Sequence, residues 1–137
     1  MTRREKREII IKVIYQINLL ESIEEKYKVK NLLKEQLEEE DLFIEDTING
    51  IVKNKKDIVE LINKYLSDKW SYDRLPMMDQ SILLLSIYEM LYTDTPNKVI
   101  IDEAIELSKL YSDEDMPKVI NGVLDNIYHN EEKINEW

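Results

Sequence analysis

Cysteine is absent from this chain of 137 residues, and only two glycines and three prolines occur. Without cysteine the chain can form neither a disulfide nor a thiolate metal site. Histidine is limited to His129, and the sequence holds no glycine-rich loop that could bind a phosphate. We therefore predict a binding protein without catalytic residues, metal site or cofactor.

Long apolar runs are also missing. The basic start of the chain, residues 1–7, continues directly into a mixed apolar and charged segment, which is not the pattern of a signal peptide. A balance of 43% apolar and 35% charged residues is too hydrophobic for a disordered chain and too charged for a membrane span. We expect a folded cytoplasmic protein without membrane association, and the length suits a single domain, 1–137.

Negative charge dominates the composition, because 29 acidic residues against 19 basic ones give a net charge of −10. Phosphate neutralisation is the main driver of general nucleic-acid binding, so any RNA site on this chain must be local. The charges are segregated in a way that permits one. Basic residues gather in 3–7, whereas 38–41 is an acidic run.

Apolar residues recur at intervals of three and four along most of the chain, which predicts an all-α fold. Segment 80–92 should be the central helix, because apolar residues surround most of its circumference. Gly50 lies inside a predicted helix and indicates either a close helix contact or a tolerated glycine. The tail 129–137 is polar enough to fray. The predicted helical segments are 4–20, 27–37, 41–52, 58–66, 80–92, 96–110 and 117–127.

Three stretches together resemble the NusB family of transcription antitermination factors. The first, 74–91, is an apolar helix that ends in Tyr-Glu-Met-Leu, and the second, 99–111, contains Asp-Glu-Ala-Ile-Glu-Leu-Ser-Lys. The third, 118–125, contains the most specific signature, Asn-Gly-Val-Leu-Asp. Their order and spacing agree with the family, and 3–8 resembles its arginine-rich entry into the first helix. The resemblance covers nearly the whole chain.

The resemblance implies an all-α, single-domain NusB-like bundle of about seven helices in two packed sub-bundles. It also implies a protein that binds the boxA single-stranded RNA of ribosomal RNA operons. The implied partners are the small-subunit ribosomal protein that acts as NusE and the RNA polymerase antitermination complex. Family members include monomers and dimers, so a homodimer stays open.

The candidate RNA-binding residues come from both ends of the chain. Arginine can hold a phosphate with two nitrogens or stack on an unpaired base. Basic residues at a helix amino terminus also oppose the helix dipole, which favours a functional reading of this cluster. Lys118 and Asn121 lie three residues apart and can share a helical face. The resemblance adds Tyr15, Asp115 and Val119, although Tyr15 can equally be a buried core ring. The full set is Arg3, Arg4, Lys6, Arg7, Tyr15, Asp115, Lys118, Val119 and Asn121.

The candidate partner-binding residues surround the central helix. An acidic patch of Asp73, Asp79 and Glu89 would complement a basic ribosomal protein, or these acids simply solvate the surface. Leu84 stands where the family often has arginine, and it either enlarges a docking surface or adds to the core. Two other functions stay open: a protein-interaction module without RNA binding, and a detached NusB-like domain of an RNA methyltransferase system.

Overall fold

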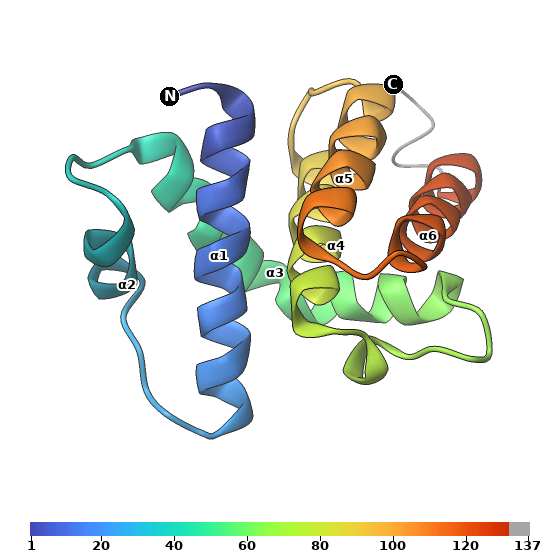
Figure 1. Cartoon of the computed structure of the whole chain (residues 1–137), viewed down its shortest axis with the longest axis horizontal. Helices are drawn as coiled ribbons and strands as arrows, with labels where there is room; N and C mark the ends of the chain where they lie inside the picture. The colour runs from blue at the N-terminus through green and yellow to red at the C-terminus, as the bar shows by residue number, and fades with distance from the viewer. Residues whose placement is uncertain (132–137) are drawn as a thin grey trace.

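The structure, a computed structural model, describes residues 1–131, and helices make up most of that part of the chain (Figure 1). The predicted all-α class is confirmed. None of the described helices is long and apolar enough to cross a membrane. The elements are α1 Arg3–Ser22, α2 Val29–Gln36, α3 Leu42–Tyr65, the short 3-10 helix η1 Tyr72–Arg74, α4 Met77–Tyr92, α5 Asn97–Tyr111 and α6 Met116–Asn130.

The helix count differs from the prediction because segments 41–52 and 58–66 belong to one continuous helix, α3. The described residues thus hold six α-helices rather than about seven. Residues 53–57 are polar, which interrupts the apolar stripe, but they include neither glycine nor proline. A polar interval alone does not end a helix, since the backbone hydrogen bonds continue through it. Asp41 caps this helix as predicted, because its carboxylate accepts a hydrogen bond of 3.0 Å from the Ile44 amide.

The tail prediction was partly wrong. His129 and Asn130 form the last turn of α6, and Glu131 accepts hydrogen bonds from the Lys64 ammonium and the Tyr65 hydroxyl. These contacts attach the end of α6 to the end of α3. The remaining residues of the predicted tail, 132–137, lie outside the described residues.

Two sub-bundles share α3 (Figure 1). Helices α1 and α2 pack with α3 on one side, and α4, α5 and α6 pack together on the other, with α3 running behind both groups. Helix α1 also packs along α4 and joins the two sub-bundles. The predicted central position of α4 is confirmed, because Ile82, Leu83 and Ile87 are fully buried. Each such side chain contributes roughly 1.5–3 kcal/mol of burial free energy.

Gly50 marks a close approach of α3 and α4. A Cβ atom at this position would lie 2.3 Å from the hydroxyl oxygen of Tyr88 and 2.6 Å from two atoms of its ring. The close-contact reading of this glycine is therefore correct.

The effect of a Gly50 substitution on the free energy of unfolding should consequently depend on Tyr88. We expect Gly50→Ala to lower the free energy of unfolding by about 1 kcal/mol, because an overpacking cost of about 2 kcal/mol exceeds a helix-propensity gain of about 1 kcal/mol. In a Tyr88→Ala background the same change should stabilise by about 1 kcal/mol. Urea unfolding of the unsubstituted chain, the two single variants and the double variant checks both signs. The same effect of Gly50→Ala in both backgrounds would contradict the contact.

Candidate nucleic-acid and partner interface

Helix α1 begins with a reciprocal cap between Thr2 and Glu5. The Thr2 hydroxyl accepts a hydrogen bond of 3.1 Å from the Glu5 amide, and the Glu5 carboxylate accepts one of 3.1 Å from the Thr2 amide. These hydrogen bonds lower the pKa of Glu5. The acid that interrupts the basic cluster therefore fixes where the helix starts.

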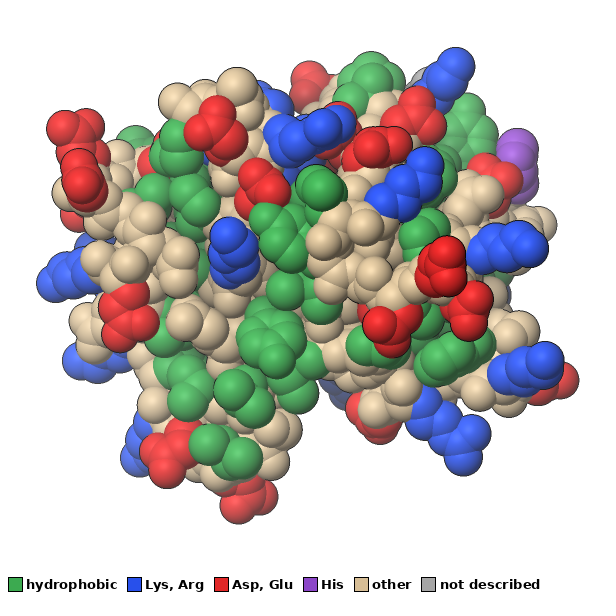
Figure 2. Space-filling model, viewed as in Figure 1, with side chains coloured by type: hydrophobic (Ala, Val, Ile, Leu, Met, Phe, Trp, Pro, Cys, Tyr) green, Lys and Arg blue, Asp and Glu red, His purple; other side chains and the backbone are tan. Residues whose placement is uncertain are grey.

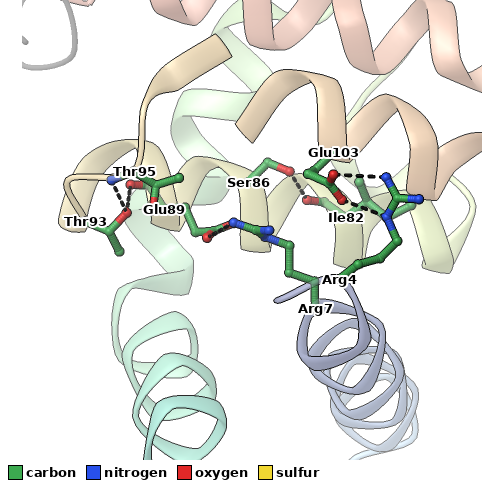
Figure 3. Close-up of polar contacts among 8 residues, drawn as sticks. All are labelled: Arg4, Arg7, Ile82, Ser86, Glu89, Thr93, Thr95 and Glu103. Carbon is green, nitrogen blue, oxygen red and sulfur yellow. Dashed lines mark hydrogen bonds and ion pairs between the residues drawn. The ribbon is translucent and has the colours of Figure 1, made fainter. Parts of the chain in front are cut away.

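The four basic residues of the first turns point in three directions. Arg4 pairs with Glu103 of α5 and Arg7 with Glu89 of α4, so their guanidinium groups diverge from α1 (Figure 3). Two others face the start of α3: the Lys6 ammonium lies 3.0 Å from Asp41, and the Arg3 guanidinium lies 4.0 Å from the centre of the Phe43 ring. The expectation that the basic residues of 3–7 form one local cluster is therefore wrong, because a helix distributes consecutive residues around its axis.

Arg7 and Glu89 form a buried ion pair. The Arg7 guanidinium donates two hydrogen bonds, of 3.0 and 2.9 Å, to the two carboxylate oxygens of Glu89. Their side chains are only 6% and 5% exposed. Neither group can meet a ligand without breaking this pair. This burial speaks against an RNA contact for Arg7 and a partner contact for Glu89, both of which stay predictions.

Two further predicted partner residues are buried. Asp79 is fully buried in the first turn of α4 and accepts a hydrogen bond from the Ser112 hydroxyl at the end of α5. Leu84 is also fully buried, so of its two readings the core one is correct. The predicted acidic patch is not present on the surface, since only Asp73 of the four partner residues is exposed.

Burial also raises the pKa of the Asp79 carboxyl, with a further contribution from nearby Asp113, while the Ser112 hydrogen bond acts in the opposite direction. The folded pKa thus lies above the unfolded value, which is about 3.9. The contribution of this carboxyl to stability is then fully present below about pH 4 and is lost as pH rises through the folded pKa.

We therefore expect Asp79→Asn to gain stability relative to the unsubstituted chain as pH rises above about 4. Urea unfolding of both chains from acidic to neutral pH measures the difference in free energy. Carboxyl groups with a lowered pKa, such as Glu103, titrate in both chains and cancel in this difference. A difference that stays constant with pH would contradict the prediction.

A polar seam runs along the contact of α1 with α5. The Arg4 guanidinium donates hydrogen bonds of 3.1 and 3.0 Å to Glu103, and the Tyr111 hydroxyl donates one of 2.5 Å to Glu8. The Lys12 ammonium lies 5.6 Å from the centre of the Tyr111 ring. Because positions 4, 8, 12 and 15 share one face of a helix, Tyr15 continues this seam. We call residues 4, 8, 12, 15, 103 and 111 the α1–α5 seam.

The exposed members of the seam are suited to contact a ligand. Tyr15 is 37% exposed, so its core reading is wrong, and the Arg4 side chain is 47% exposed despite its ion pair. The Glu103 hydrogen bonds and charge raise the pKa of Arg4, and the Arg4 hydrogen bonds lower the pKa of Glu103. Lys12 was missed from the sequence, although its spacing from Arg4 and Tyr15 places it on their face.

The predicted residues of α6 lie at its start and along its outer face. Asp115, Lys118 and Asn121 are exposed, whereas Val119 is half-buried and packs against the core. Asn121 also lines a shallow groove between α5 and α6, beside Asp102 and Asp125. The contact of Tyr111 with Glu8 and Lys12 places the α5–α6 connection next to α1, so both ends of the predicted RNA set lie on neighbouring elements.

Apolar side chains accompany these charges on the same face of the molecule. Figure 2 shows them along the middle of this face, between scattered acidic and basic groups. The exposed apolar residues Tyr15 and Leu19 of α1, and Ile23 directly after its end, follow one another at intervals of four. The described residues include no group of three or more acidic or histidine side chains that could hold a metal ion.

The described residues form six α-helices, with α4 buried among the others and a polar and aromatic seam exposed between α1 and α5. This arrangement defines a small helical-bundle protein with a candidate binding surface on one face. A sequence model of the NusB family matches residues 4–129. The chain belongs to the NusB family.

Individual relatives agree with this assignment. A transcription antitermination protein NusB from Listeria monocytogenes is 43% identical over 129 residues, which cover 93% of this chain and 96% of the relative. The structure of NusB from T. maritima superposes with a TM-score of 0.83 at 35% identity, covering 98% of both chains. A chain from a complex of the antitermination factors NusB and NusE with double-stranded RNA superposes with a TM-score of 0.75 at 26% identity, covering 94% of this chain and 98% of that one.

Proposed function

We propose that this protein is a cytoplasmic transcription antitermination factor. It binds boxA-type single-stranded RNA of ribosomal RNA operons together with the ribosomal protein that acts as NusE, and the pair is loaded onto RNA polymerase. The observation that carries this proposal is the family match over 4–129, supported by the similarity to a NusB chain solved with NusE and RNA. A role in binding, rather than in chemistry, accords with the names of the relatives.

The RNA surface that we propose combines the α1–α5 seam with the outer face of α6. Tyr15 supplies a ring on which an unpaired base can stack. Lys12 and Lys118 supply ammonium groups for phosphates, and the Asn121 amide can bond a base edge. Asp115 and Val119 border this surface. Arg3 and Lys6 face the start of α3 and lie outside this surface.

Arg4 belongs to this surface if its guanidinium exchanges the Glu103 carboxylate for an RNA phosphate. An exposed ion pair contributes only about 0–1 kcal/mol, so a phosphate can replace Glu103 on the guanidinium at little cost. Arg7 cannot make this exchange, since its partner is buried with it. The difference between these two arginines is a difference of burial and not of charge.

The test of the proposed function is a gel mobility shift of boxA RNA against a scrambled RNA of equal length, with and without the ribosomal protein, at a stated salt concentration. We expect weak preference for boxA alone and stronger binding with the ribosomal protein. Binding of the ribosomal protein without any effect of RNA sequence would instead favour the protein-interaction module. That second function is favoured by one observation, the ion pairing of Arg4, Lys6 and Arg7 within the protein.

Removal of the anion that competes for Arg4 should strengthen RNA binding. We expect Glu103→Gln to raise RNA affinity about two- to fivefold, the range that corresponds to one exposed ion pair. The matched control is Glu106→Gln, which removes the same charge from the same helix; Glu106 pairs with Lys109 and acts on Arg4 only through its charge, without a hydrogen bond. Equal effects of both substitutions would show that only net charge matters and that Glu103 does not restrain Arg4.

A further inference from the structure

A groove lies between α2 and the segment that leads into α3. Its lining residues, which define what we call the α2–α3 groove, are Lys30, Leu33, Lys34, Leu37, Glu38, Glu39, Glu40, Asp41 and Glu45. The volume is about 210 Å³, which is below the roughly 300–1,000 Å³ of small-molecule and cofactor sites. A space of this size suits one anchoring side chain of a larger partner.

The floor of the α2–α3 groove is apolar. Leu33 is 6% exposed and belongs to the core, and Leu37 is half-buried where the chain leaves α2. Leu42, at the first position of α3, is 70% exposed and directly follows the lining residue Asp41 in the sequence. Exposed apolar surface beside a formed groove is a common mark of a protein interaction site.

The two walls of the groove carry opposite charges. Lys30 and Lys34 stand on the α2 side, and the three consecutive acids Glu38, Glu39 and Glu40 stand on the other. These three are exposed, and none of them forms an ion pair with another residue in the part of the chain that the structure describes. Their charges are therefore available to a partner.

The neighbouring acid Asp41 is already engaged, because it caps α3 and lies 3.0 Å from the Lys6 ammonium. Asp41 therefore ends the acidic wall, and its charge is not available to a partner. Three adjacent carboxylates repel the phosphates of a nucleic acid. The occupant of this groove is thus a protein and not an RNA strand.

We propose that the α2–α3 groove binds a basic amphipathic segment of a partner protein. One apolar side chain of that segment packs on Leu33 and Leu37, and its Lys or Arg residues face Glu38–Glu40. The Lys30 and Lys34 wall sets the direction of the segment, because it repels the basic side. This docking surface adds to the proposed function and does not depend on it.

The groove and the α1–α5 seam are on different sides of α1. Lys6 and Arg3 turn toward the groove and the start of α3, whereas Arg4 and Glu8 turn toward α5. A segment in the groove therefore leaves Tyr15 and the rest of the seam accessible. A partner protein and an RNA strand can occupy the same molecule together.

The experiment uses the whole chain and a synthetic peptide of about 15 residues that has leucines and lysines at helical spacing, with a second peptide in which glutamates replace the lysines. Nuclear magnetic resonance shifts of backbone amides locate the binding site. We expect the lysine peptide to shift the amides of the groove residues and the glutamate peptide to leave them unchanged. Shifts that map elsewhere, or no binding, would overturn the proposal.

Charge-matched variants separate a specific site from general attraction to an acidic protein. The triple substitution Glu38→Gln, Glu39→Gln, Glu40→Gln should weaken lysine-peptide binding about tenfold at low salt. The control triple, Glu25→Gln, Asp57→Asn, Glu60→Gln, removes the same charge from exposed positions outside the groove and should have a much smaller effect. Equal weakening by both triples, or displacement of the peptide by single-stranded RNA, would overturn the proposal and leave the antitermination function unaffected.

Discussion

Replacing Arg7 with methionine is expected to destabilise the protein by about 3–5 kcal/mol. The substitution leaves the Glu89 carboxylate in a site where its side chain is only 5% exposed and where both of its oxygens lose their hydrogen-bond donors. Taking one partner from a buried pair is costly because the remaining charge is neither solvated nor compensated. Urea unfolding followed by circular dichroism measures the loss.

Two variants show whether burial is the cause. Arg4→Met breaks the exposed pair with Glu103 and should cost no more than about 1 kcal/mol. The double variant Arg7→Met, Glu89→Leu removes both charges and should recover most of the lost stability, because apolar residues can replace a buried pair without penalty. If Arg7→Met and Arg4→Met were equally mild, the pair would not support the contact of α1 with α4.

The second large effect concerns RNA. We expect the triple variant Tyr15→Ala, Lys118→Ala, Asn121→Ala to bind boxA RNA at least about 30-fold more weakly. The stacking contact of Tyr15 and the base contact of Asn121 contribute about 1–3 kcal/mol each, and 1.4 kcal/mol corresponds to a factor of about ten. Loss of the Lys118 phosphate contact adds to this. The three side chains are exposed, so the fold should persist. Fluorescence anisotropy of labelled RNA, titrated with the variant in the presence of the ribosomal protein, measures the change.

The matched control replaces the same residue types elsewhere on the molecule. Tyr92, Lys56 and Asn49 are exposed on α4 and α3, and their triple alanine variant should bind RNA nearly as the unsubstituted chain does. Loss of Lys118 alone should also reduce the slope of log affinity against log salt by about 1. Equal losses for the two triple variants would show that the proposed RNA surface is wrong.

Helix periodicity predicted the fold class because it depends only on neighbouring residues. The apolar circumference of 80–92 was enough to place α4 at the centre. The three stretches in matching order, of which the signature at 121–125 is the most specific, indicated the family. The same periodicity wrongly divided α3 into two helices. A polar interval has the same composition in a turn and on the exposed side of a long helix.

The candidate site was harder to predict because it depends on contacts between distant residues. Arg7 shares the inward stripe of α1 with Ile10 and Ile14, a spacing visible in the sequence, but its place in a charged run suggested exposure. Its partner is 82 residues away, and the partner of Arg4 is 99 residues away. No local pattern identifies such partners. The exposure of Tyr15, Lys118 and Asn121 agrees with a binding role, which stays a prediction.

The continuity of α3 has a consequence for how the protein unfolds. Its apolar side chains, such as Ile48 and Ile62, lie in the core at well-separated positions along one 24-residue helix, which spans about 36 Å. Neither sub-bundle can melt without exposing part of the surface that the other covers. Denaturation should therefore be a single concerted transition, and hydrogen exchange should find the slowest amides along this shared strut.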